Sequence, residues 1–159
     1  MAIASLRAGE TISAGDALFV SSTGLVFKAL GDTQDHASVV GLAVNGGVVG
    51  DLIRVNTDAL YQSSTSYSPL ERLYLSATTS GAYAKYETVI SGLELTSRPG
   101  TFFTEIGSAV TTNKINVEIS LPTYKVNTTA ILLLESSAGV DLDAILQEDG
   151  TTIKTEDAV

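Results

Sequence analysis

His36 is the only histidine of the chain, so a catalytic Ser-His-Asp arrangement would depend on it alone. It lies beside Asp35 in the polar stretch Gly31–Ala37, where a solvated loop histidine is the expected state. Acid–base and nucleophilic catalysis need several convergent groups whose protonation can be tuned. The chain contains no G-x-S-x-G turn and no cysteine to supply a nucleophile. We therefore expect the protein not to be an enzyme.

The glycine-rich segment Gly46–Gly50 resembles a phosphate-cradling loop only superficially. Such loops lead into a helix whose N-terminus faces the anion, whereas this segment leads into Leu52–Val55, a strand-like run. The glycines are therefore expected to form turns. Gly15-Asp16 and Gly50-Asp51 are assigned to turns as well, because Asp in such a position hydrogen-bonds its own backbone.

Two further groups of side chains raise the question of a ligand. Four acidic residues near the C-terminus lack the spacing of a calcium loop and are expected to be solvated charges: Asp141, Asp143, Glu148 and Asp149. Five tyrosines could stack on a sugar: Tyr61, Tyr67, Tyr74, Tyr83 and Tyr86. Tyr74 and Tyr83 align with Phe19 and Phe27 in an internal echo described below, which favours packing over binding. We expect no metal and no cofactor, and carbohydrate binding is the alternative from another functional class.

Composition limits the class of protein. The 159 residues suit one domain or one domain with an arm, and 44% hydrophobic residues with 14 glycines and only 17% charged residues favour a strand-rich chain. A net charge of −9 repels phosphates, so nucleic-acid binding is not expected. No apolar run approaches the ~18 residues of a membrane span, and the N-terminus lacks a secretory signal pattern. Synthesis in the cytoplasm is therefore the expectation.

Apolar runs separated by glycine-marked turns predict an all-β body over residues 1–122, which ends at Pro122. A first hairpin joins Leu18–Val20 to Val26–Lys28, and two further strands, Val39–Val44 and Leu52–Val55, flank Asn45-Gly46-Gly47. A helix is not predicted anywhere in the body. A further strand is expected at Val89–Leu95.

The same succession of strands recurs later in the chain. The matching segments are Leu18–Ser21 with Leu73–Ser76, Val26–Ala29 with Ala82–Lys85, Val40–Val44 with Ile106–Val110, and Ile53–Val55 with Ile115–Val117. This echo predicts one β-motif used twice, assembled as a small β-barrel or sandwich.

Residues 123–159 differ in character and are predicted to form an extended C-terminal arm. Its apolar segments are too short to make a core alone. The arm pairs either with a neighbouring subunit or with a sheet edge of its own domain, and the residues expected to make that contact are Ile131, Leu132, Leu133 and Leu134.

A resemblance to a known family rests on the runs GETISAGDALFV, VVGLAV, GDLIRV and GSAVTTNKINVEIS, within Ala8–Leu121. They resemble the "G-E-x-I-x-x-G-D" hairpin and the following "V-V-G-(I/L/V)-A" and "G-D-x-(V/I)-x-V" strands of tailed-bacteriophage head decoration (capsid cement) proteins and related virion β-modules. The segment Ala8–Asp16 alone is also similar to β-clip modules of some sugar-binding and chaperone proteins.

The phage resemblance implies a structural virion protein that binds the outside of a capsid and stabilises contacts between capsomers. Its partners would be the major capsid protein and further copies of itself, in a homotrimer or a dimer. A tail, fibre or neck component is the alternative within the same class. On the body, the residues first expected to touch a partner are the turn residues Asn45, Gly46 and Gly47.

Overall fold

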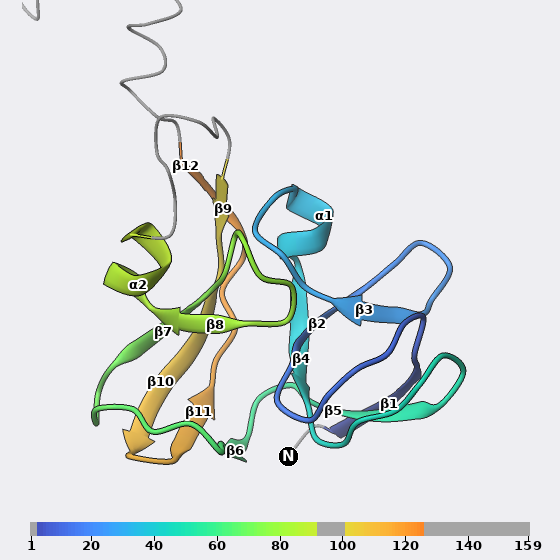
Figure 1. Ribbon diagram of the computed structural model, residues 1–159, viewed down its shortest axis with the longest axis horizontal. Coiled ribbons are helices and arrows are strands. Elements are labelled where there is room, and N and C mark those ends of the chain that lie inside the picture. The colour runs from blue at the N-terminus through green and yellow to red at the C-terminus, as the bar shows by residue number, and fades with distance from the viewer. Residues whose placement is uncertain (1–2, 92–100, 126–159) are drawn as a thin grey trace, which may run out of the picture. The chain divides into compact units, whose positions relative to one another are not determined.

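The computed structural model describes residues 3–91 and 101–125. They contain twelve strands and two short helices, which confirms the predicted all-β class (Figure 1). The described residues belong to one compact unit, which continues through Thr123–Lys125, beyond the predicted end of the body at Pro122. The predicted arm contact at Ile131–Leu134 and the acidic group near the C-terminus lie outside the described residues.

The first β-module comprises residues 3–56. Its elements are β1 (Ile3–Arg7), β2 (Ala17–Val20), β3 (Val26–Lys28), α1 (Gln34–Ala37), β4 (Val39–Ala43) and β5 (Leu52–Asn56). The strands form an antiparallel sheet in the order β1-β5-β4-β2-β3. A single parallel bridge between Ala8 and Val26 brings the two edges of this sheet together without closing a barrel.

The second β-module comprises residues 60–117. Its elements are β6 (Leu60–Gln62), β7 (Arg72–Leu75), β8 (Tyr83–Lys85), α2 (Tyr86–Ser91), β9 (Thr101–Phe103), β10 (Glu105–Thr111) and β11 (Lys114–Val117). Its main sheet has the order β6-β11-β10-β7-β8, which repeats the strand order of the first module (Figure 1). The predicted double use of one β-motif is therefore present in the topology. A last strand, β12 (Thr123–Lys125), pairs with β9.

Both modules carry a β-bulge at the same place. The pairing register shifts by one residue at Val40, between β2 and β4, and at Ile106, between β7 and β10. A glycine follows each bulge, and a side chain on Gly41 or Gly107 would lie well inside van der Waals distance of a carbonyl oxygen on the adjacent strand. Close approach of two backbones at a bulge therefore requires glycine at both positions.

One type of turn occurs three times, at Ser13–Asp16, Val48–Asp51 and Ser68–Glu71. In each, the carboxylate of the fourth residue accepts a hydrogen bond from the backbone N–H of the first, at 2.8, 2.9 and 3.1 Å. The third residue has a positive φ, 95° at Gly15, 92° at Gly50 and 69° at Leu70. The turn assignment of both Gly-Asp pairs is confirmed. The third turn was not predicted, because leucine and glutamate take the places of glycine and aspartate.

The core is divided between the modules. One cluster lies within the first module and consists of Ala8, Ile12, Leu18, Val26, Ala43, Ile53 and Val55. A larger cluster joins side chains of both modules, among them Phe19 and Leu42 from the first and Leu73, Leu75 and Ile106 from the second. The buried Thr104 hydroxyl adds a link by donating a 2.6 Å hydrogen bond to the Ala37 carbonyl. The two modules therefore fold against each other as one body.

Three local predictions differ from the structure. The loop at Gly31–Ala37 contains the helical turn α1, which Thr33 caps by accepting a hydrogen bond from the His36 N–H. Val89, the start of the predicted strand Val89–Leu95, lies in helix α2. Tyr83 pairs with Leu75 and so occupies the place of Val26, whereas Ala84 takes the place of Phe27. A slip of one residue reverses the face of a strand side chain, so the predicted match of Tyr83 with Phe27 is wrong.

Candidate functional site

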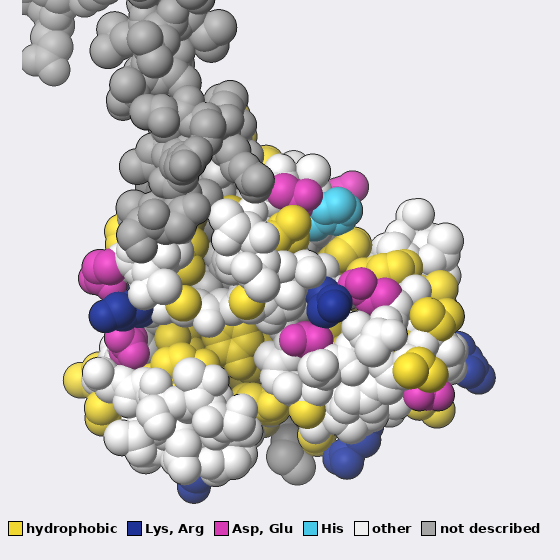
Figure 2. Space-filling view, viewed as in Figure 1, with side chains coloured by type: hydrophobic (Ala, Val, Ile, Leu, Met, Phe, Trp, Pro, Cys, Tyr) yellow, Lys and Arg dark blue, Asp and Glu magenta, His cyan; other side chains and the backbone are white. Residues whose placement is uncertain are grey.

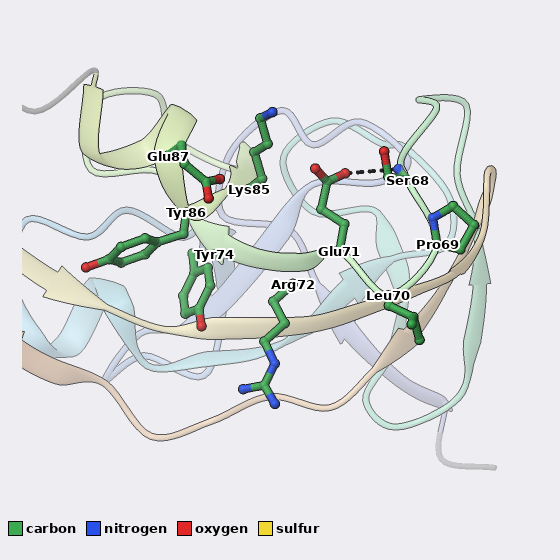
Figure 3. A pocket seen from close by; sticks show the side chains of 9 residues that line it. All are labelled: Ser68, Pro69, Leu70, Glu71, Arg72, Tyr74, Lys85, Tyr86 and Glu87. Atoms are coloured by element: carbon green, nitrogen blue, oxygen red, sulfur yellow. Dashed lines mark hydrogen bonds between the residues drawn. The ribbon is translucent and has the colours of Figure 1, made fainter.

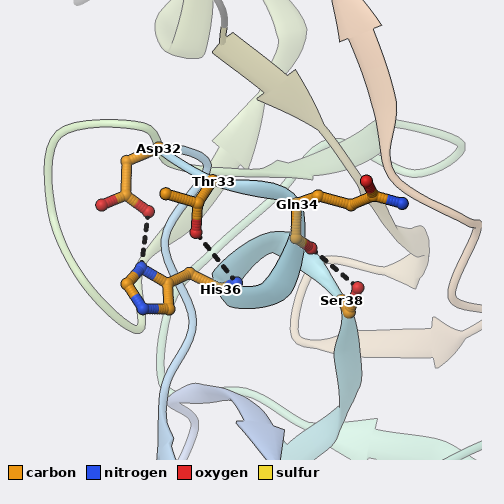
Figure 4. Close-up of polar contacts among 5 residues, drawn as sticks. All are labelled: Asp32, Thr33, Gln34, His36 and Ser38. Carbon is orange, nitrogen blue, oxygen red and sulfur yellow. Dashed lines mark hydrogen bonds and ion pairs between the residues drawn. The ribbon is translucent and has the colours of Figure 1, made fainter. Parts of the chain in front are cut away.

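The only histidine belongs to a small polar cluster on α1 (Figure 4). The Nδ1 atom of His36 lies 2.9 Å from a carboxylate oxygen of Asp32, and its ring packs at a tilt against Phe19, with centroids 4.9 Å apart. The nearby Ser38 hydroxyl donates to the Gln34 carbonyl at 2.8 Å. Ser38 thus faces the backbone of the helix, and the contacts of His36 with Asp32 and Phe19 are those of a side chain anchored on a surface turn.

Tyr61 and Tyr83 of the second module lie near enough to Asp16 of the first to be affected by its charge. The Tyr83 hydroxyl hydrogen-bonds to Tyr67, and burial, strengthened by the charges of Tyr67, Tyr61 and Asp16, raises the pKa of Tyr83 above its ordinary value. Burial also raises the pKa of Tyr61. Tyr74 instead packs edge-on against Tyr86, at 5.5 Å between centroids. These rings pack within the unit, as predicted for Tyr74 and Tyr83.

The predicted partner contact at Asn45-Gly46-Gly47 is largely occupied by bonds within the module. The Asn45 side chain donates to the Leu52 carbonyl at 3.1 Å and accepts from the Arg54 N–H at 2.8 Å. Gly47 exchanges two 2.9 Å backbone hydrogen bonds with Ile12. These residues brace the hairpin, and the polar groups of Asn45 that a partner could bind are already in use.

The adjoining turn offers the more accessible apolar surface. Val48 and Val49 are 58% and 67% exposed, and Leu52, which follows the turn, is 58% exposed. Asp51 holds the turn closed through the Val48 N–H, so the two valines project from a fixed backbone. We refer to these three side chains as the valine turn. This surface was not predicted, because Gly50-Asp51 indicates a turn but does not indicate that the valines before it are exposed.

A second accessible surface lies on the second module, between the Ser68–Glu71 turn and the end of β8 (Figure 3). It is a cleft of about 510 Å³, with Leu70, Arg72, Lys85, Tyr86 and Glu87 among its lining residues. Leu70 is 85% exposed, and Figure 3 shows it pointing away from the aromatic pair Tyr74 and Tyr86. We call this surface the Leu70 cleft. A signal for it existed in the sequence, since Ser68 and Glu71 repeat the spacing of Ser13 and Asp16.

The hydrophobic surface of the second module continues from this cleft. Tyr67 and Tyr83 line a neighbouring hollow together with Glu71 and Lys85. Figure 2 shows hydrophobic side chains in a hollow below β8, with acidic and basic side chains at its left edge. The Leu70 cleft and the neighbouring hollow each combine apolar and aromatic side chains with charged residues at the edge, an arrangement typical of sites that bind another protein.

Among residues 3–91 and 101–125, no three carboxylate or imidazole groups come together as a metal site. In the same ranges, no helix has the length and apolar character needed to cross a membrane. Searches against protein-family models and against curated proteins find no match to this chain.

Proposed function

We propose that this chain is a structural virion protein that binds the outer surface of a phage capsid as a homo-oligomer and stabilises contacts between capsomers. The partner is the major capsid protein, and the location is the virion. The observation that carries the proposal is the resemblance to phage decoration proteins, together with the structural part that each residue of the shared motif takes in this fold.

The motif residues of the first module all serve to build one rigid hairpin. The Phe27 ring fills the space that a side chain at Gly9 would need. The Glu10 carboxylate accepts a 2.6 Å hydrogen bond from the Lys28 N–H, and Ile12 is buried. Asp16 closes the turn that precedes β2. These motif residues therefore have structural roles, which suits a protein that presents a fixed surface to a capsid lattice.

The valine turn is the surface that we propose for the capsid contact. It places three exposed apolar side chains on a fixed turn, so contact there removes apolar area from water. A protein that binds the assembled shell but not free subunits shifts the assembly equilibrium by its binding free energy, and many copies multiply that effect.

Co-sedimentation tests the proposal. The full chain is mixed with phage shells assembled from a major capsid protein, and occupancy is measured against concentration. We expect saturable binding that Val49→Glu weakens by about tenfold or more, since burial of a valine contributes on the order of 1.5 kcal/mol. Leu121→Glu, at an exposed apolar position that follows the second module, is the matched control and keeps the wild-type occupancy.

Two results would contradict the capsid proposal. Absence of binding to the shell with retention on isolated tails, fibres or necks would assign the chain to the alternative structural location. Binding to a glycan array without any binding to virion parts would assign it to the carbohydrate-binding class.

A further inference from the structure

The repeated topology gives each surface of one module a counterpart on the other. Gly24, in the β2–β3 loop, corresponds to Gly81, in the β7–β8 loop, and both have a φ of +78°. Ser21 and Ser76 begin these loops, and their hydroxyls form equivalent hydrogen bonds with Thr23, at 2.7 Å, and with Thr78, at 3.3 Å. The two glycines therefore occupy equivalent sites, and their surroundings can be compared directly.

Gly81 docks on the first module. Its N–H donates to the Ala29 carbonyl at 2.8 Å, and its carbonyl accepts from the Ala17 N–H at 2.9 Å. It also lies against Asp16, which a side chain at Gly81 would meet at 3.0 Å. The β7–β8 loop is thus inserted between the ends of β2 and β3, and Gly81, Ala17 and Ala29 are all buried.

The contact is not reciprocated. If the modules were related by a two-fold axis, Gly24 would dock on the second module in the same way. Gly24 is instead exposed, and a side chain added there would meet nothing within 4 Å. The relation is therefore head to tail, which leaves one loop and one receiving surface unused among the described residues.

The strand register identifies the unused receiving surface. Leu18 pairs with Lys28 as Leu73 pairs with Lys85, so the residues that flank the second pair, Arg72 and Tyr86, are the counterparts of Ala17 and Ala29. Arg72 has 69% of its side chain exposed, and Tyr86 is 43% exposed. Both line the Leu70 cleft. The cleft thus lies at the position that the β7–β8 loop covers on the first module, with helix α2 beginning at the place of Ala29.

We propose that a second copy of this chain places its β2–β3 loop in the Leu70 cleft, in the head-to-tail manner of the contact within the chain. The sizes of the two surfaces are complementary. The β2–β3 loop is shorter, since Ser21 bonds to Leu25 whereas Ser76 bonds to Ala82. The cleft offers arginine and tyrosine where the first module has two alanines, and these longer side chains fill the space that a shorter loop leaves.

A head-to-tail contact repeats from copy to copy until the rotation closes a ring or extends a filament. This inference deepens the self-association in the proposed function, but it rests on the two modules alone. Loss of capsid binding by an assembled protein would refute the capsid role and leave this contact untouched. A monomer that binds shells would refute this contact and leave the capsid role standing.

The experiment uses two variants of the full chain, each altered on one side of the contact. Leu70→Asp places a charge in the cleft at an exposed residue whose positive φ aspartate tolerates. Ser22→Glu alters the exposed β2–β3 loop. Masses are measured by light scattering and native mass spectrometry at a concentration at which the wild type assembles. Val49→Glu, outside both surfaces, is the matched control and keeps the wild-type mass.

We expect each variant alone to be a monomer of 16.5 kDa and their equimolar mixture to form a dimer of twice that mass, with nothing larger. In the mixture, the intact loop of one variant meets the intact cleft of the other, and the remaining two surfaces are blocked. A wild-type monomer, variants that keep the wild-type mass, or a mixture that stays monomeric would each overturn the proposal. Circular dichroism that matches the wild type shows that each variant is folded.

Discussion

Three glycine-to-alanine substitutions separate two reasons for glycine in this fold, which are a positive φ and the lack of space for a side chain. Gly50 has a φ of +92° and open space around it, so Gly50→Ala tests conformation alone. Gly41 has no positive φ, but a side chain there would overlap the Asn56 carbonyl, so Gly41→Ala tests space alone. Gly107 has a φ of +150° and would overlap the Asn116 carbonyl, so Gly107→Ala tests both.

The expected magnitudes follow from these differences. A positive φ costs an ordinary residue about 1–2 kcal/mol, partly offset by the lower entropy of the unfolded alanine chain. Overlap with a backbone atom forces strands apart and costs about 1–3 kcal/mol. We therefore expect the free energy of unfolding to fall by about 1 kcal/mol in Gly50→Ala, about 2 in Gly41→Ala and about 3 or more in Gly107→Ala.

Urea unfolding followed by circular dichroism measures these losses. With a slope of about 1.5 kcal/mol per molar urea, the midpoint of Gly107→Ala would fall by about 2 M. The slope itself should stay unchanged, because the same surface is exposed on unfolding. If Gly107→Ala and Gly50→Ala shared one midpoint, the Asn116 carbonyl would have to move aside freely, and the account of the bulge would be wrong.

Three further outcomes follow from single contacts. Leu70→Gly should raise the free energy of unfolding by about 1 kcal/mol by relieving a φ of +69°, whereas Leu121→Gly, at an equally exposed position without positive φ, should not. Thr104→Val should lower the free energy of unfolding by about 1–3 kcal/mol in thermal or urea unfolding, because the buried Ala37 carbonyl loses its donor. Thr104→Ser keeps the hydroxyl and should retain most of the wild-type stability. Burial raises the pKa of Tyr83 above 10, so above that pH the unfolded chain releases its proton first and stability falls; urea midpoints measured from pH 8 to about pH 11 should fall less in Tyr83→Phe.

The sequence predicted most of the strands because their signal is local. The β2–β3 hairpin is found at the predicted residues, and β4 and β5 lie within one residue of the predicted strands. Helix α2 was missed because Val89 belongs to an apolar run that fits a strand as well as a helix, and the contact of that residue with Phe103 and Ala77 decides between them. That contact depends on the fold and is not visible in a short window.

The accessible surfaces were harder to predict than the strands. Asn45 is polar and lies in a turn, which favours exposure, but its amide is used by the Leu52 and Arg54 backbone. Leu70 is apolar and would be expected inside, yet it occupies the glycine position of a turn and is exposed. In both cases the position of the residue in its turn, and not its type, determines how accessible its side chain is to a partner.

The two modules have the same residue type where the backbone leaves no room for a side chain, and different residue types beside the hairpin strands. Gly41 and Gly107 both follow a bulge, because a strand carbonyl leaves no room for a side chain at either place. The residues flanking the β2–β3 and β7–β8 pairs differ instead, with small Ala17 in the covered position and Arg72 in the open one. A duplicated module can keep its fold and still acquire two distinct ends, since the bulge and turns fix the backbone while the side chains at each end remain free to differ. Because the β7–β8 loop is docked and the β2–β3 loop is exposed, one loop and one receiving surface remain available for the proposed head-to-tail contact with another copy.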